Sequence, residues 1–127
     1  MPTKFWICLT TLLLVLPLGC VTGSIGRPRV DIAFVNQSST DLEAVSARFG
    51  QYECGGGYLG RTFLKGYGDF RHPITNDVEV RWEVNRTLKV ERLDLRKVYP
   101  PGKAGRLTFT ITDKGVSASF AVESAPR

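Results

Sequence analysis

Apolar and polar residues alternate along most of this chain, and that alternation limits its fold more than any other feature. It is clearest in Val78–Val84 (VEVRWEV), where four apolar residues face one way and three charged residues the other. A period of two is typical of strands, and one dry face is typical of a sheet packed on a core. The same pattern indicates about seven strands: Val30–Val35, Leu42–Phe49, Tyr58–Leu64, Val78–Val84, Thr87–Leu95, Arg106–Thr112 and Val116–Val122.

Polar and glycine-rich segments separate these strands at short intervals, which is the profile of a β-sandwich. We predict turns at Asn36–Asp41, Lys65–Gly68 and Asp113–Gly115, and a loose glycine-rich turn over Gly50–Gly57. A chain of 127 residues has room for one domain. We therefore expect an all-β fold, a single antiparallel sandwich of immunoglobulin-like arrangement, with a flattened barrel as the nearest alternative.

The first residues of the chain predict export. Lys4 precedes Phe5–Leu18, a stretch without charge that is too short to span a membrane and suits the apolar part of a signal peptide. Gly19 and Cys20 follow it as in a bacterial lipobox, in which the cysteine carries the lipid. The match is incomplete, because Pro17 stands where that pattern has leucine, valine or isoleucine.

These features divide the chain into three segments. We expect residues 1–19 to be a lipoprotein signal peptide, residues 20–28 to be the lipidated Cys20 and a tether, and residues 29–124 to be the sandwich domain. An ordinary signal peptide cut after Gly23 is the alternative. In either case the domain lies outside the cytosol.

The cysteines limit how the domain can be stabilised. Cys8 leaves with the signal peptide, and Cys20 is either lipidated or removed, so Cys54 remains alone. No disulfide can then form within one chain. The apolar core has to hold the domain together, and a domain of roughly 100 residues is large enough for that.

The charge balance suggests what kind of partner the domain meets. The chain carries 17 Lys and Arg residues against 12 Asp and Glu, a net charge of +5. Basic residues mixed with aromatic ones are common in nucleic-acid modules, but an exported chain seldom meets nucleic acid. We therefore expect an acidic protein partner, besides the lipid bilayer reached through Cys20. The predicted partner-binding residues are Tyr58, Arg61, Lys65, Tyr67, Phe70, Arg71 and Arg92.

Two structural alternatives compete with this binding site. We place Tyr58–Ile74 on loops between strands, where a rigid sandwich commonly carries recognition residues. Alternatively, Phe63, Leu64 and Phe70 only close one end of the core. The basic window from Arg86 to Lys97 can likewise be a solvated sheet face that nearby acidic residues balance.

No residues form a convincing catalytic or cofactor site. Cys54, Asp69 and His72 could in principle supply a thiol, a carboxylate and an imidazole, but no known nucleophile motif surrounds the cysteine. A structural zinc site needs four ligands, and the chain has one histidine. The run Gly55–Gly57 lacks the lysine and hydroxyl residue of a phosphate-binding loop. We expect no enzyme activity, no metal and no cofactor.

Three segments resemble small, poorly characterised lipoproteins of Gram-negative bacteria: VNQSSTDLEAVSARFGQYEC, HPITNDVEVRWEV and LRKVYPPGKAGRLTFTI. The resemblance implies an immunoglobulin-like sandwich that faces the periplasm. Val21 after the lipidated cysteine implies the outer rather than the inner membrane. Some such lipoproteins are immunity proteins that neutralise delivered toxins, so we expect a non-enzymatic protein-binding module. A structural lipoprotein of an envelope or secretion complex is the first alternative, and a thiol-dependent enzyme is the second.

Overall fold

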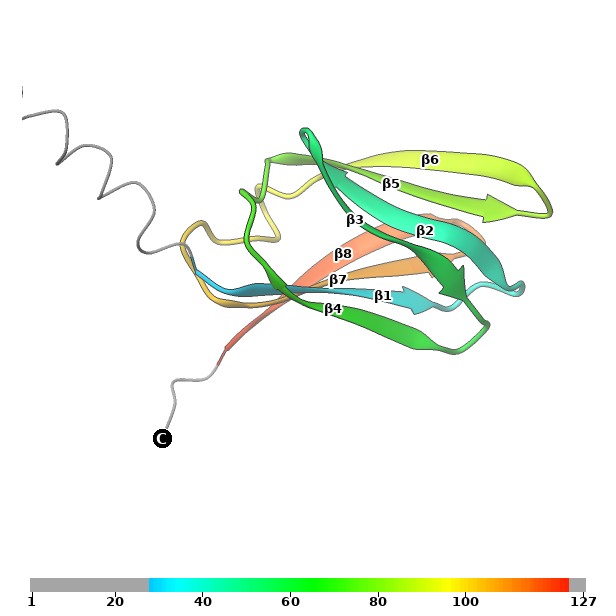
Figure 1. Cartoon of the computed structure of the whole chain (residues 1–127), viewed down its shortest axis with the longest axis horizontal. Helices are drawn as coiled ribbons and strands as arrows, with labels where there is room; N and C mark the ends of the chain where they lie inside the picture. The colour runs from blue at the N-terminus through cyan, green and yellow to red at the C-terminus, as the bar shows by residue number, and fades with distance from the viewer. Residues whose placement is uncertain (1–27, 124–127) are drawn as a thin grey trace, which may run out of the picture.

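The computed structural model describes residues 28–123, which form eight strands in two packed sheets (Figure 1). The predicted signal peptide, Cys20 and the predicted tether up to residue 27 lie outside the described residues, as does Ser124, the last residue of the predicted domain. Within residues 28–123 there is no helix that could cross a membrane. The strands are β1 (Val30–Asn36), β2 (Leu42–Phe49), β3 (Tyr52–Leu59), β4 (Leu64–Phe70), β5 (Asp77–Val84), β6 (Thr87–Asp94), β7 (Gly105–Thr112) and β8 (Gly115–Val122).

The strand order makes the chain cross between the sheets four times. One sheet has the order β4-β1-β7-β8, and the other has the order β3-β2-β5-β6. Hairpins join β2 to β3, β5 to β6 and β7 to β8 within a sheet. The prediction of purely antiparallel sheets is wrong at one place, because β1 and β7 pair in parallel from Val30↔Gly105 to Asn36↔Ile111. The prediction of an all-β, two-sheet fold is confirmed.

The alternating residues form the core between the two sheets. Val78, Val80 and Trp82 of β5 are buried, as the alternation predicts. Three aromatic rings lie at the centre: Phe34 stacks on Phe109 with centroids 5.7 Å apart, and Phe49 lies 6.2 Å from Phe109. All the buried hydrophobic residues of the described chain lie between Val30 and Ile111. Residues 28–123 therefore carry a complete core and both sheets.

A bulge in β2 explains why its alternation changes phase. Leu42 is buried, but the next buried apolar residue is Val45, three positions later rather than two. Ala44 adopts a positive φ of 52°, and the pairing of β2 with both neighbours shifts at this point. One extra residue in a strand allows both apolar residues to face the core. Downstream of the bulge, Ala47 and Phe49 are buried as predicted, but Ser46 is buried too.

The structure contradicts the predicted turns in the glycine-rich part of the chain. Most of Gly50–Gly57, taken as a loose turn, belongs to β3, and all of Lys65–Gly68 belongs to β4. The predicted strand Tyr58–Leu64 is instead the end of β3, a short turn and the first residue of β4. Glycine has no side chain to alternate, so the period-two signal disappears although the backbone still pairs. The chain therefore has eight strands rather than about seven.

The turns gather at two opposite ends of the sandwich (Figure 1). We call one end the tip; it holds the turns at residues 37–41, 60–63, 85–86 and 113–114. We call the other end the base; β1 begins there and β8 ends there. Both ends of the described chain therefore leave the domain at the base, opposite the tip (Figure 1).

Candidate functional site

Asn36 at the end of β1 organises the tip. It is fully buried, and its side-chain amide donates to the backbone oxygens of Thr40 at 2.9 Å and Leu59 at 3.0 Å. Its side-chain oxygen accepts bonds from the backbone N–H and the hydroxyl of Ser38, at 2.9 and 2.6 Å. One side chain thus fixes the β1–β2 turn against the end of β3.

The backbone of Asn36 fixes a second turn. Its N–H donates to the oxygen of Phe63 at 3.1 Å, and its oxygen accepts from the N–H of Thr62 at 3.0 Å. The turn at residues 60–63 is closed by a bond from the Phe63 N–H to the Gly60 oxygen at 3.1 Å. Buried polar groups that are all paired give a segment one fixed conformation. The β3–β4 turn is therefore held rigidly beside the β1–β2 turn.

Asp41 positions two of the predicted partner-binding residues, Tyr58 and Arg61. Its carboxylate accepts the backbone N–H of Arg61 at 2.9 Å and the hydroxyl of Tyr58. These bonds, the backbone one first, lower the pKa of Asp41, and the same carboxylate raises the pKa of Tyr58. The Arg61 guanidinium lies 4.0 Å from Asp41 and is largely exposed. Its charge remains available to solvent or to a partner.

The tip exposes three large hydrophobic side chains close together in the chain. Tyr58 is 58% exposed, Phe63 66% and Leu64 56%. The side chains of Tyr58, Arg61 and Phe63 line a hollow of about 520 Å³ with polar residues of the β1–β2 turn. We call Tyr58, Arg61, Phe63 and Leu64 the tip surface. Phe63 and Leu64 do not close the core, contrary to the alternative raised above.

The structure places the remaining predicted residues elsewhere. Lys65 follows the tip surface on β4, and its ammonium lies 5.7 Å from the centre of the Tyr67 ring. Tyr67 itself packs edge-on against Phe34 of the core at 5.9 Å. Phe70 packs against Phe49 at 5.0 Å. Tyr67 and Phe70 are therefore half-buried residues that cover the core, rather than members of a recognition loop.

Phe70 and Arg71 also lie at the wrong end of the domain to join the tip surface. β4 runs from Leu64 at the tip to Phe70 at the base, a distance of ~20 Å at the usual rise of a strand. Arg71 contacts the carboxylate of Asp69 at 2.8 Å, and that contact raises the pKa of Arg71. The predicted site is thus divided, with Tyr58, Arg61 and Lys65 near the tip.

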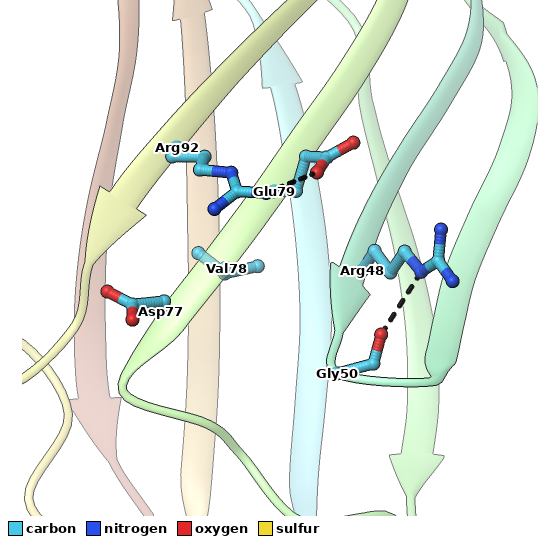
Figure 2. Close-up of a pocket in the computed structure, with 6 residues that line it drawn as sticks. All are labelled: Arg48, Gly50, Asp77, Val78, Glu79 and Arg92. Atoms are coloured by element: carbon cyan, nitrogen blue, oxygen red, sulfur yellow. Dashed lines mark hydrogen bonds and ion pairs between the residues drawn. The ribbon is translucent and has the colours of Figure 1, made fainter.

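Arg92 lies on the other sheet and lines a different hollow, of about 280 Å³ (Figure 2). Its guanidinium lies 3.6 Å from the carboxylate of Glu79 on the neighbouring strand β5. In the same hollow the Arg48 guanidinium donates to the backbone oxygen of Gly50 at 3.1 Å (Figure 2). The alternative interpretation, a solvated face with local charge balance, describes Arg92 better than a role in the tip surface does.

The three residues considered for catalysis each have another environment. Cys54 is buried in β3, and burial raises the pKa of its thiol to about 11. Such a thiol stays protonated at neutral pH, whereas the thiolate is the nucleophile. His72 stacks on Tyr52 with centroids 3.9 Å apart, and Asp69 contacts Arg71. In residues 28–123 no group of three or more His, Cys, Asp or Glu residues could hold a metal ion.

Sequence reasoning missed the two residues that build the site, Asn36 and Asp41. Both were placed in a polar turn. The alternation of Val30, Ile32 and Phe34 nevertheless continues to position 36, where an inward-facing asparagine signals a buried polar group that needs partners.

Comparisons of the chain with protein-family models, with curated proteins and with solved structures gave no match.

Proposed function

We propose that this chain is a membrane-anchored periplasmic lipoprotein whose tip surface binds another protein, with neutralisation of a delivered toxin as the most specific form of that function. One observation carries the proposal: the tip exposes Tyr58, Phe63 and Leu64 around a turn that hydrogen bonds to the buried Asn36 hold in place. Rigid, exposed aromatic side chains with an arginine beside them are characteristic of binding hot spots.

The direction of the chain favours a protein over a lipid as the ligand of the tip. The described chain begins at the base, at the end opposite the tip surface (Figure 1). If Cys20 carries the lipid, the base faces the membrane and the tip faces away from it. The positive charges of Arg61 and Lys65 near the tip then favour an acidic protein surface.

The lipoprotein resemblance and its immunoglobulin-like arrangement belong to this proposal. The two packed sheets are compatible with the β-sandwich part of that resemblance. The strand order differs from that of constant-type immunoglobulin domains, in which the first, second, fourth and fifth strands share a sheet. Here the first, fourth, seventh and eighth strands do. Burial of Cys54, which raises the pKa of its thiol, favours a binding module over a thiol-dependent enzyme.

We predict that Arg61→Glu with Phe63→Ser abolishes partner capture. The full chain with a C-terminal tag is expressed in its native host, and proteins held by the variant and the unaltered chain are compared quantitatively. Loss of an aromatic and an arginine hot spot lowers capture of the partner at least ~10-fold. The matched control is Val90→Ser with Arg92→Glu, which removes one exposed apolar and one exposed arginine side chain from β6.

The control variant is expected to retain the partner. Equal capture by the unaltered chain and both variants would show that the tip surface does not bind. Loss with the control alone would move the site to β6. Partners that are assembly or secretion components, rather than a toxin, would select the structural lipoprotein in place of the immunity protein.

A further inference from the structure

The loop between β6 and β7, residues 95–104, carries positive charges and no negative one. Arg96, Lys97 and Lys103 lie in it, and all three side chains are exposed. The Arg96 guanidinium contacts the carboxylate of Asp94 at 2.6 Å, and Lys97 is only the weakest of the causes that lower the pKa of that carboxyl. Within residues 28–123 neither lysine forms an ion pair. The loop therefore adds the charge of two lysines to the base of the domain.

Hydrogen bonds and one ring contact fix the shape of this loop. The N–H of Leu95 donates to the oxygen of Asn76 at 2.7 Å, and the N–H of Tyr99 donates to the oxygen of Leu95 at 2.8 Å. The Tyr99 ring packs edge-on against Phe120 of β8, with centroids 5.0 Å apart. Two prolines follow and restrict the backbone further. The basic side chains are therefore carried on an ordered support.

The loop lacks the apolar anchors of the tip surface. None of the large hydrophobic side chains that the described chain exposes belongs to residues 95–104. Val98 and Tyr99 are half-buried and pack against the core. Protein interfaces depend on exposed aromatic and aliphatic anchors, whereas the anionic headgroups of a membrane attract lysines through charge alone. This composition favours a lipid surface over a protein.

The loop ends beside the place where the described chain begins. The N–H of Gly105 donates to the backbone oxygen of Arg29 at 3.1 Å, and Figure 1 shows the loop beside the start of β1. Arg29 and Arg106 add positive charge here. Asp31 contacts Arg29 at 3.5 Å, and Glu123 lines a hollow with the two arginines, so these four charges offset one another. The excess charge beside the start of β1 thus comes from the lysines of the loop.

We propose that the β6–β7 loop, through Lys97 and Lys103, binds the anionic headgroups of the membrane to which Cys20 is anchored. The inference rests on the anchor of the proposed function. From Cys20 to Pro28 the chain can extend over at most about 30 Å, and this segment contains no Asp or Glu. An anchor at Cys20 therefore brings the bilayer to the base, where a protein partner would have to enter between the domain and the membrane.

This contact sets the direction of the whole domain. With the base on the headgroups, the tip surface faces away from the bilayer and stays open to its partner. Each lysine beside an anionic surface strengthens binding about fivefold. Two such contacts are weak by themselves, but the anchor keeps the loop at a high local concentration near the headgroups, so weak contacts suffice.

Vesicle binding by the polypeptide of residues 28–127 tests the loop without the anchor. This polypeptide contains the complete core and both sheets. It is sedimented at low ionic strength with vesicles of phosphatidylglycerol or of phosphatidylcholine. We expect binding to the anionic vesicles alone, and release as the salt concentration rises. Lys97→Glu with Lys103→Glu should lower the partition coefficient at least ~10-fold, and the milder pair Lys97→Gln with Lys103→Gln should show a smaller loss.

The matched control is Lys89→Glu with Lys114→Glu, which changes the net charge equally. Both lysines are exposed and line a hollow near the tip. The control should bind the anionic vesicles as the unaltered polypeptide does, and denaturant unfolding shows that each variant folds. Equal binding to the two kinds of vesicle, no binding to either, or an equal loss in the loop variant and the control would overturn the proposal. Capture of a protein by the tip does not use the loop lysines, so either result can fail without the other.

Discussion

Asn36→Ala is expected to lower the free energy of unfolding by about 3 kcal/mol and to melt the domain about 15 °C lower. The substitution removes four hydrogen bonds and leaves the backbone oxygen of Leu59 buried without its donor. It also frees the β1–β2 turn, so the hollow beside Tyr58 and Phe63 loses one wall. Denaturant unfolding of the polypeptide of residues 28–127 measures the first effect, and partner capture measures the second.

Two further variants separate the hydrogen bonds from the loss of a side chain. Ser38→Ala removes one hydroxyl that Asn36 binds and should cost only about 1 kcal/mol. Asn36→Asp keeps the shape but directs an oxygen at the two backbone oxygens of Thr40 and Leu59.

The Asn36→Asp variant should also make stability depend on pH. Repulsion raises the pKa of the new carboxyl in the folded state, so the variant is penalised above the ordinary aspartate pKa and recovers as the pH falls towards it. We therefore expect a greater loss at pH 7 than at pH 4, relative to the unaltered chain. An equal loss at the two pH values would contradict the role given to the amide donor.

Gly55→Ala is the second large effect, with an expected loss of about 4 kcal/mol. Gly55 has a φ of 107°, and a Cβ atom there would lie 2.5 Å from the backbone oxygen of Val45 and 3.2 Å from the Phe34 ring. Both the backbone strain and the overlap destabilise the variant. Because Gly55 has no side chain, β3 can lie directly against the bulge of β2. That contact positions the end of β3, and with it Tyr58, at the tip.

Gly56→Ala is the matched control for that variant. Gly56 has nearly the same φ, 108°, but a Cβ atom there would meet nothing within 4 Å. The control should therefore lose only the strain, about 1–2 kcal/mol. The difference between the two variants, measured by denaturant unfolding, gives the cost of the close approach. Losses of equal size would contradict the packing of β3 on β2 described above.

The strands that were predicted correctly are those in which apolar and polar side chains alternate along the extended backbone. β5 and β7 alternate without a gap, and their inward residues are buried. β3 and β4 were missed because five glycines lie in them, and a strand position without a side chain carries no alternation. The parallel pairing of β1 with β7 could not be predicted, because it depends on which strands become neighbours.

The candidate site was predicted by residue type and only partly by position. Tyr58 and Arg61 were chosen because aromatic and arginine residues dominate interfaces, and both lie on the tip surface. Phe70 and Arg71 were grouped with them because they are near in sequence, but an extended strand separates near residues by many ångströms. Alternation along β8 would place Val122 on the core-facing side with Phe120, yet Val122 is exposed.

The most direct test of the account is photo-crosslinking from the tip in intact cells. A photoreactive amino acid replaces Phe63 in the full chain, and in a control it replaces Val90 on β6; both native side chains are exposed. The account predicts that position 63 crosslinks to one discrete exported protein, that position 90 does not, and that the crosslinked product is found in the membrane fraction. Crosslinks to cytosolic proteins, or identical products from both positions, would contradict it.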